Sequence, residues 1–418
     1  MAIPAAEPYL PFDGPRPTSP LLTVLIVATV AVFITGLVSV AALSTSQTNS
    51  PQDAVNSLLA AASTGNVEGV LASIDPAEAS ALSAPLSQTV DDLKALGVLS
   101  SSADLHAITG VSASFSKVGM HTAAIDPSRT DLAAVTFTGG TATLHVDVSQ
   151  LPLGSLIAGF LKGRGLDSGS LDRSGPLAEG DQHPLVTVQR DGVWYVSIGY
   201  SIAEAARLQA GLPFPTTPVP AVGASSATGV AQTLVSAATG GDARRLVEIL
   251  APDEMQAVHD YGQLFLTKTA PPTPSPVTVT ALDLATSPVS GGTLVTVKDF
   301  SATVHGDVVA LTAEGCFVAS GPDVPGGSRR LCEPSGSNLL AGYGIVAVQR
   351  GGSWYLDPLR TVADDAEHII RGVNVSELGK LLSSGGPAAL FTDVIGFGTA
   401  ATGNGVVPLR SGSLAPIP

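Results

Sequence analysis

Histidine and cysteine are the side chains from which a metal site or a nucleophilic site is most often built, and this chain has seven histidines and two cysteines. The histidines show neither the HExxH pattern nor the paired spacing that brings two imidazoles to one face of a helix. They are His106, His121, His145, His183, His259, His305 and His368. Cys316 and Cys332 alone cannot complete the ligand set of a structural zinc ion. The sequence therefore predicts no metal site and no cofactor.

Two short stretches are similar to catalytic motifs. SFSK, from Ser114 to Lys117, has the serine and lysine spacing of penicillin-interacting acylases, but it lies in a strand-like run and its companion motifs SDN and KTG are missing. VHDYG, residues 258–262, contains a Tyr and an Asp of the kind that hold an enolate and shuttle a proton. Three adjacent residues on a helix point in different directions, however, so they do not converge on one reacting atom. We predict no catalytic residue and expect a protein that is not an enzyme.

Composition narrows the classes of partner. The chain has 418 residues, 44% of them hydrophobic, which is enough to build packed cores. Its net charge is -15 and its pI is near 4.7. Because affinity for nucleic acids and for anionic lipid surfaces depends on basic patches, we expect no nucleic-acid binding and no polybasic membrane attachment. Arg exceeds Lys and Ala is abundant, which resembles the usage of high-GC bacterial genomes.

A long apolar stretch predicts a membrane span. Residues 21–43, LLTVLIVATVAVFITGLVSVAAL, contain no charge. As a helix they cover about 34 Å, enough to cross a hydrocarbon core of about 30 Å. Arg16 precedes the stretch and no Lys or Arg follows it until Lys94, so the positive-inside rule places the N-terminus in the cytoplasm and the rest outside. A cleaved signal peptide and a buried core helix are the alternatives.

The two cysteines lie on the side of the membrane that this topology makes oxidising. An even number of cysteines in an extracytoplasmic chain favours a disulfide between Cys316 and Cys332. The bond would tie the Gly- and Pro-rich excursion GPDVPGG, residues 321–327, back onto the apolar strand that we expect to end at Cys316. Two buried reduced thiols are the alternative.

Beyond the span the chain repeats itself. Residues 54–76, AVNSLLAAASTGNVEGVLASIDP, align with residues 230–252, VAQTLVSAATGGDARRLVEILAP, at an offset of 176. Apolar residues at three- and four-residue steps predict a buried helical stripe in each copy, and a Gly break divides each copy into two helices. Each second helix should stop before a proline, at Pro76 and at Pro252, because proline disfavours helical backbone in the residue before it.

Both tryptophans lie in similar octapeptides, QRDGVWYV at residues 189–196 and QRGGSWYL at residues 349–356. The central Asp-Gly and Gly-Gly suit a two-residue hairpin turn, whose backbone needs positive φ angles. Such a turn places Gln189 opposite Trp194 and leaves apolar side chains on both faces of the hairpin. Two further antiparallel pairs are expected around the turns at residues 139–140 and 305–307.

The aromatic residues of these hairpins are predicted to be core anchors, and ligand stacking is the alternative for the tryptophans. They are Trp194, Tyr195, Trp354 and Tyr355. The offset between the two octapeptides is 160 rather than 176, so the first copy carries 16 extra residues. We assign these to the Gly-rich stretch at residues 151–182.

The order of these motifs resembles the nuclear-transport-factor-2-like, or cystatin-like cone, superfamily, especially its membrane-tethered bacterial members. The features that carry the resemblance are the helical pair with GN or GD before the second helix and the last strand with DGVWYV or GGSWYL. The likeness covers residues 52–205 and 228–370. It implies an α+β fold in which an N-terminal transmembrane helix is followed by two repeated domains, each with helices and a curved antiparallel sheet.

The predicted organisation is a Pro-rich cytoplasmic tail at residues 1–20, the span at 21–43, a first cone-like domain at 52–210, a Pro-rich linker at 211–226, a second cone-like domain at 227–385 and a Gly-rich tail at 386–418. Members of this superfamily use their pocket for ligands, for catalysis or only for contacts, so the fold does not determine the function. We expect a membrane-tethered extracytoplasmic binding or scaffold protein of the bacterial cell envelope, held in the lipid bilayer by residues 21–43. Its partner is expected to be a cell-envelope protein or a small apolar ligand. The alternative is a cone-pocket enzyme or a carrier of a small apolar ligand.

Overall fold

The computed structural model describes one structural unit that lies within residues 35–373. The described residues are 48–104, 106–163, 167–178, 184–266, 277–312, 316–322, 324, 326–331 and 342–372. Several predicted features lie outside them: the tail at residues 1–20, the span at 21–43, Cys332, and the Gly-rich tail at 386–418. Within the described residues, no helix is long and apolar enough to cross a membrane.

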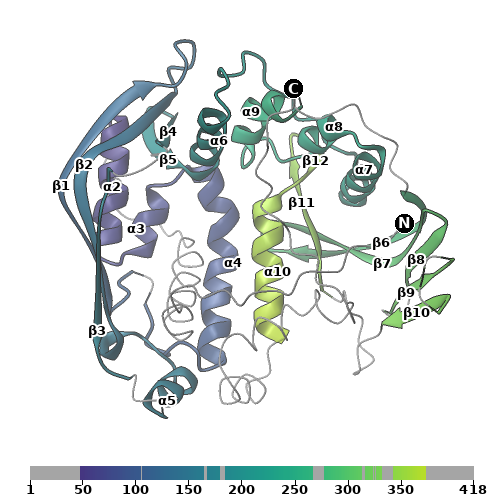
Figure 1. The fold of residues 1–418 in the computed structure, drawn as a ribbon, viewed down its shortest axis with the longest axis horizontal. Coiled ribbons are helices and arrows are strands. Elements are labelled where there is room, and N and C mark those ends of the chain that lie inside the picture. Colours follow the sequence, from purple (N-terminus) through teal and green to yellow (C-terminus); the bar gives the residue numbers. More distant parts are fainter. Residues whose placement is uncertain are drawn as a thin grey trace, which may run out of the picture. The chain divides into compact units, whose positions relative to one another are not determined.

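Two halves of this unit begin and end in the same way: three helices and two strands come first, and two strands and a helix come last (Figure 1). The first half contains α2 (Pro51–Ser63), α3 (Val67–Ala72), α4 (Pro76–Ala95), β1 (Val111–Ala124), β2 (Leu132–Asp147), the 3-10 helix η1 (Val148–Gln150), α5 (Ser155–Gly163), β3 (Ser170–Pro176), β4 (Leu185–Arg190), β5 (Val193–Ser197) and α6 (Ile198–Gln209). The second half contains α7 (Ala227–Gly240), α8 (Ala243–Glu248), α9 (Gln256–Leu266), β6 (Val277–Val289), β7 (Gly292–Val304), β8 (Asp307–Leu311), β9 (Phe317–Ser320), β10 (Ser328–Leu331), β11 (Gly344–Arg350), β12 (Ser353–Leu356) and α10 (Pro358–Gly372).

Each half builds one curved antiparallel sheet. The first sheet runs β1-β2-β4-β5, with β3 also paired to β2. The second sheet runs β10-β9-β8-β7-β11-β12, with β6 also paired to β7. The path β1-β2-β4-β5 therefore corresponds to β6-β7-β11-β12. The described part of the chain is an α+β fold with curved antiparallel sheets, as the sequence predicts.

The helical pairs begin and end where the sequence indicates. Ser50 caps α2 by accepting a hydrogen bond from the backbone of Asp53, and Ser226, 176 positions later, caps α7. Asn66 and Asp242, again 176 apart, cap the short helices α3 and α8. Helix α3 ends before Pro76. Pro76 is the first residue of α4, a position at which a helix tolerates proline.

The register of both tryptophan hairpins is confirmed. Gln189 lies opposite Trp194 and Gln349 lies opposite Trp354. The turn residues of both hairpins have positive φ, for example 50° at Asp191 and 56° at Gly351. Successive side chains of each strand point to opposite faces of the sheet.

The two faces of the first hairpin pack against different helices. One face buries Trp194 against Ala54 and Val55 of α2. The other face buries Val186 and Val188 against α6 and α9, and α9 belongs to the second half of the chain. One hydrophobic cluster is thus shared by both halves. The predicted Pro-rich linker at 211–226 also contributes to this region, since Phe214 packs edge-on against Tyr261.

Contacts that join helices to the last hairpin recur in both halves at the same offsets. Ile74, which follows α3, bridges to Val196 in β5, and its counterpart Leu250 bridges to Leu356 in β12. The backbone N–H of Trp194 donates to the carbonyl of Thr48, and that of Trp354 donates to the carbonyl of Ala224. The same hairpin edge is covered in the same way in both halves.

Two strand predictions were wrong. Gly139 and Gly140 do not form a hairpin turn, because β2 runs straight through them and pairs with β1 on both sides. A β-bulge at Lys117, whose φ is 52°, takes up the irregularity at this point instead. The apolar strand expected to end at Cys316 is the second: β8 ends at Leu311, and Cys316 precedes β9.

Candidate functional site

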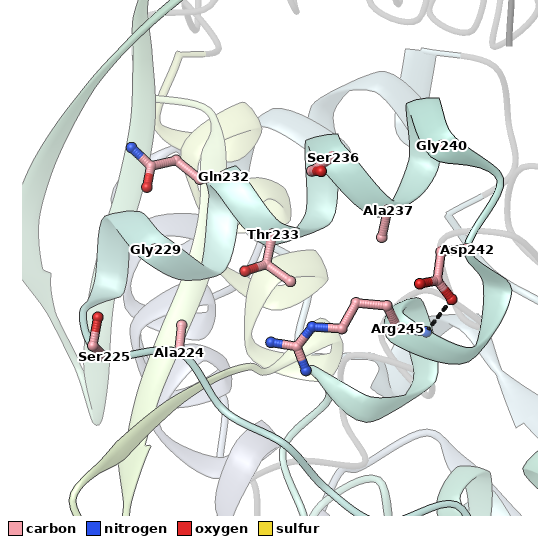
Figure 2. Close-up of a pocket in the computed structure, with 10 residues that line it drawn as sticks. All are labelled: Ala224, Ser225, Gly229, Gln232, Thr233, Ser236, Ala237, Gly240, Asp242 and Arg245. Atoms are coloured by element: carbon pink, nitrogen blue, oxygen red, sulfur yellow. Dashed lines mark hydrogen bonds between the residues drawn. The ribbon is translucent and has the colours of Figure 1, made fainter. Parts of the chain in front are cut away.

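An open groove of about 730 Å³ runs along α7 and α8 in the second half (Figure 2). Its lining is mostly small or polar: Ala224, Ser225, Gly229, Gln232, Thr233, Ser236, Ala237, Gly240, Asp242 and Arg245. A volume of this size lies within the range of roughly 300–1,000 Å³ that is usual for ligand sites. This groove is our candidate functional site.

The amphipathic pattern of α7 determines which side chains reach the groove. Val230 and Ala231 face the sheet and are buried with Val295 and Ala347 of the second core. The opposite side of the helix therefore presents polar residues, of which Gln232 is exposed.

The turn from α7 to α8 positions the cationic side of the groove. Gly241 ends α7 with a φ of 69°, a left-handed conformation that favours glycine. Asp242 then caps α8, and its carboxylate accepts a hydrogen bond of 2.9 Å from the backbone N–H of Arg245. The short α8 is thereby held beside α7, so that Thr233 and Arg245 lie on facing sides of the groove (Figure 2).

Arg245 is held in place by the protein yet still reaches the groove. Its Nη1 donates a hydrogen bond of 2.6 Å to the carbonyl of Val222, and its guanidinium lies 3.7 Å from the carboxylate of Glu248. The side chain is 25% exposed. A planar guanidinium fixed in this way offers its other N–H groups to a carboxylate, a phosphate or a carbonyl oxygen of a ligand.

The first half has no equivalent of this cation. The residue that corresponds to Arg245 is Gly69, and a Cβ atom there would come within 2.9 Å of the Cβ atom of Ala61 on α2. The two helices of the first half therefore approach more closely than any larger residue would permit. Sequence reasoning missed the groove, although the alignment of Gly69 with Arg245 at the offset of 176 was a usable signal.

The predicted core anchors lie beside the groove or far from it, and none of them lines it. Trp194 is 9% exposed and belongs to the first core. Tyr195 packs against the core cluster shared by both halves, and Tyr355 packs against Val346 and Val348. Trp354 packs against the core under α7, and its backbone pairs with Ala224 at one end of the groove.

The VHDYG residues face separate partners. Asp260 accepts hydrogen bonds from the hydroxyl of Tyr200, at 2.5 Å, and from Nη1 of Arg129, at 2.7 Å. Tyr261 donates its hydroxyl to Glu204 at 2.8 Å. Burial raises the pKa of both tyrosines. These groups hold α6 to α9 and do not converge on a common point.

The other candidate site residues are not brought together either. Ser114 lies in β1 opposite Thr143, within a strand that has Lys117 at its bulge. Among the described residues, no three His, Cys, Asp or Glu side chains are grouped so that they could hold a metal ion. Cys316 is 5% exposed, and its predicted partner Cys332 lies outside the described residues.

Comparison with known proteins adds no relative: no family model, curated protein or solved structure matches the chain. The function must therefore be argued from the groove, from the fold that positions it, and from the sequence.

Proposed function

We propose that this chain is a membrane-tethered, extracytoplasmic binding or scaffold protein of the bacterial cell envelope, and that the α7–α8 groove is its contact surface. The observation that carries the proposal is the fixed but accessible guanidinium of Arg245 in a groove of polar side chains. A buried structural arginine would have its donors enclosed by protein acceptors, whereas this one lines the groove and is 25% exposed.

Duplication explains why only one half carries the groove. We take the two halves to be copies of one cone-like domain, because their caps, bridges and hairpin contacts recur at offsets of 176 and 160. In this interpretation the first copy keeps a closed helical pair, with Gly69 at the close approach. The second copy has diverged at the same surface to bind a partner.

The lining suggests the chemistry of the partner. Gln232, Thr233 and Ser236 offer amide and hydroxyl groups along one face of α7, and Arg245 offers a cation on the facing side of the groove. These groups suit an extended hydrophilic segment that carries a carboxylate, such as a polar loop of an envelope protein. A small apolar ligand would find few matching side chains here.

A photo-crosslinking amino acid at position 236 tests the contact surface in intact cells. Ser236 is exposed in the groove, and its counterpart Ala60 is exposed on α2, so position 60 is the matched control. We expect a discrete crosslinked product from position 236 that disappears in the Arg245→Ala protein, and none from position 60. Equal labelling from both positions, or a product that does not depend on Arg245, would contradict the proposal.

Protease added to intact cells tests the membrane topology separately. If residues 21–43 span the membrane with the N-terminus inside, the protease should remove the chain after residue 44 and leave the first twenty residues protected. Protection of the long C-terminal segment would refute this orientation without bearing on the groove.

A further inference from the structure

A second cavity, of about 350 Å³, lies where the two halves meet. It is lined by α4 of the first half and by α10, β11, the end of β6 and the β6–β7 turn of the second. The helices α4 and α10 run side by side there (Figure 1). Its lining combines charged and apolar side chains: Pro85, Gln88, Pro288, Val289, Ser290, Val346, Arg360, Asp364, Glu367 and Arg371. None of these residues takes part in the α7–α8 groove.

The buried cation of this cavity is already committed to the protein. Arg360 donates to the carbonyl of Ser80 at 3.0 Å and to the carbonyl of Ser290 at 3.4 Å. Its Nε lies 2.9 Å from the carboxylate of Asp357, and the side chain is only 9% exposed. Arg360 therefore joins α4, the β6–β7 turn and α10, and it has little capacity left for a ligand.

The second cation is shared by two carboxylates. Arg371 donates its Nε to Asp92 of α4 at 2.9 Å, and its Nη2 pairs with Glu367 one turn earlier on α10. One guanidinium thus neutralises two acids, so the guanidinium side of the cavity has no free positive charge with which to bind an anion.

Asp364 is the acid of the cavity that has no direct hydrogen bond or ion pair within the described part of the chain, although the charges of His368 and Arg371 act on it and oppose the effect of its burial. It is only partly exposed and lines the cavity. Burial raises the pKa of Asp364 and also that of Glu367, one turn further along α10. Both carboxylates would be stabilised as anions by a positive charge placed in the cavity.

Apart from Gln88 and Ser290, the remaining walls are apolar. This part of the cavity is lined by Pro85 of α4, by Pro288 and Val289 at the end of β6, and by Val346 of β11. A hydrocarbon chain of a few carbons can bury its surface against these side chains, which favours binding.

We propose that this cavity binds a small aliphatic primary amine. The ammonium group would lie against the carboxylate of Asp364 and beside Glu367, which shares Arg371 with Asp92. The short hydrocarbon chain would lie against the two prolines and Val289. Since the walls come from α4 and α10, the ligand would also bridge the two halves of the chain.

Calorimetric titration of the purified full chain with n-butylamine tests this proposal. n-Butanol and butyrate, which keep the hydrocarbon chain without the positive charge, should bind at least tenfold more weakly. Asp364→Asn should weaken butylamine binding at least tenfold as well, because the substitution removes the charge and keeps the shape. Asp91→Asn is the matched control, since Asp91 is exposed on α4 and does not line the cavity.

A second variant keeps the test independent of charge. Gln88 is exposed at the edge of the cavity, so Gln88→Trp should fold normally and block the site, with a loss of binding at least as large as that of Asp364→Asn. Thermal unfolding of each variant, followed by circular dichroism, checks that the fold is intact. The proposal is overturned if the native chain does not bind butylamine, if butanol binds equally well, or if Asp364→Asn and Asp91→Asn have the same effect.

Discussion

Glu78 in the first half and Glu254 in the second are buried acids at corresponding positions, but their surroundings differ. Glu78 accepts hydrogen bonds from the hydroxyl of Ser197 at 2.6 Å and from the backbone N–H groups that open α6. At the offset of 160, Ser197 corresponds to Asp357, so the equivalent Glu254 faces a second carboxylate. One carboxylate oxygen of Glu254 and one of Asp357 are buried without a hydrogen bond from the described residues. The second half therefore buries two acids that repel each other, and each of them is paired with an arginine: Glu254 with Arg350 and Asp357 with Arg360.

This pair makes stability depend on pH. Burial raises the pKa of Glu254 above 4.5, and the charge of Asp357 raises it further. A raised pKa in the folded state means that the folded protein binds the proton more tightly than the unfolded chain does. The stability from this group is therefore fully present below about pH 4.5 and is lost as the pH rises through the folded pKa.

We expect Glu254→Gln to raise the free energy of unfolding at pH 7 by about 1 kcal/mol and to have no stabilising effect at pH 4. The amide keeps an acceptor for Arg350, which now donates to the glutamate, but it carries no charge. Urea unfolding at both pH values measures the difference, and the exposed Asp91→Asn is the control. A gain of the same size at both pH values would rule out the electrostatic explanation.

The disulfide between Cys316 and Cys332 is still a prediction. Phe317, which follows Cys316, pairs with Leu331, which precedes Cys332. An antiparallel register that continued by one residue would place the two cysteines opposite each other, at the short separation that a disulfide needs.

We expect protein purified from the cell envelope without reductant to resist alkylation at both cysteines, as read by mass spectrometry. Reduction should then lower the free energy of unfolding of the protein by about 3 kcal/mol. Complete alkylation of Cys316 and Cys332 in the exported protein would show reduced thiols and would weaken the extracytoplasmic assignment.

At the scale of elements, one turn determines how a hairpin meets a helix. Gly291, between β6 and β7, has a φ of 73°, and a Cβ atom there would collide with the guanidinium of Arg360 on α10. Gly192, in the β4–β5 turn, has a φ of 84° and open space around the same position. Substitution of Gly192 therefore reports only the cost of placing a side chain at positive φ. Substitution of Gly291 reports that cost together with the cost of displacing Arg360.

Gly192→Ala should lower the free energy of unfolding by about 1 kcal/mol, the usual cost of a left-handed alanine. Gly291→Ala should lower it by at least about 2 kcal/mol, because Arg360 must also move away from the turn. Urea unfolding of the two variants gives the comparison. Equal losses would mean that the turn does not rest on Arg360.

The same elements show how far the sequence predicts the fold. Helix caps, proline stops and the Trp194 hairpin follow from local patterns, because each depends on residues a few positions apart. The packing of α9 on the first sheet could not be predicted, because it is a contact between the two halves. The apolar stripe of α9 indicates that the helix is buried on one side but not against which sheet. The α7–α8 groove could not be predicted from local patterns either. Arg245 belongs to no motif, and its difference from the other half is visible only when it is aligned with Gly69.

At the scale of the whole molecule, the two halves share a core. Tyr200 of α6 and Tyr261 of α9 are almost completely buried, and each donates its hydroxyl to a carboxylate of the other half. Separating the halves would expose both rings and leave buried acids with fewer hydrogen bonds. Independent hydrophobic patterns in the sequence predict two domains, whereas these contacts lead us to expect that the domains unfold together.

The two tryptophans allow this coupling to be measured, because Trp194 lies in the first half and Trp354 in the second. Trp354→Phe leaves a fluorescent reporter of the first half, and Trp194→Phe leaves a reporter of the second. Introduced into both proteins, Tyr261→Phe should lower the free energy of unfolding by about 1–2 kcal/mol and shift both urea transitions together, because it removes the hydrogen bond to the buried Glu204. Tyr355→Phe is the control, since its hydroxyl makes no hydrogen bond to the described residues and its ring stays in the core of the second half. If Tyr261→Phe shifted only the transition reported by Trp354, the halves would be independent domains, and the shared core would contribute nothing to their cooperativity.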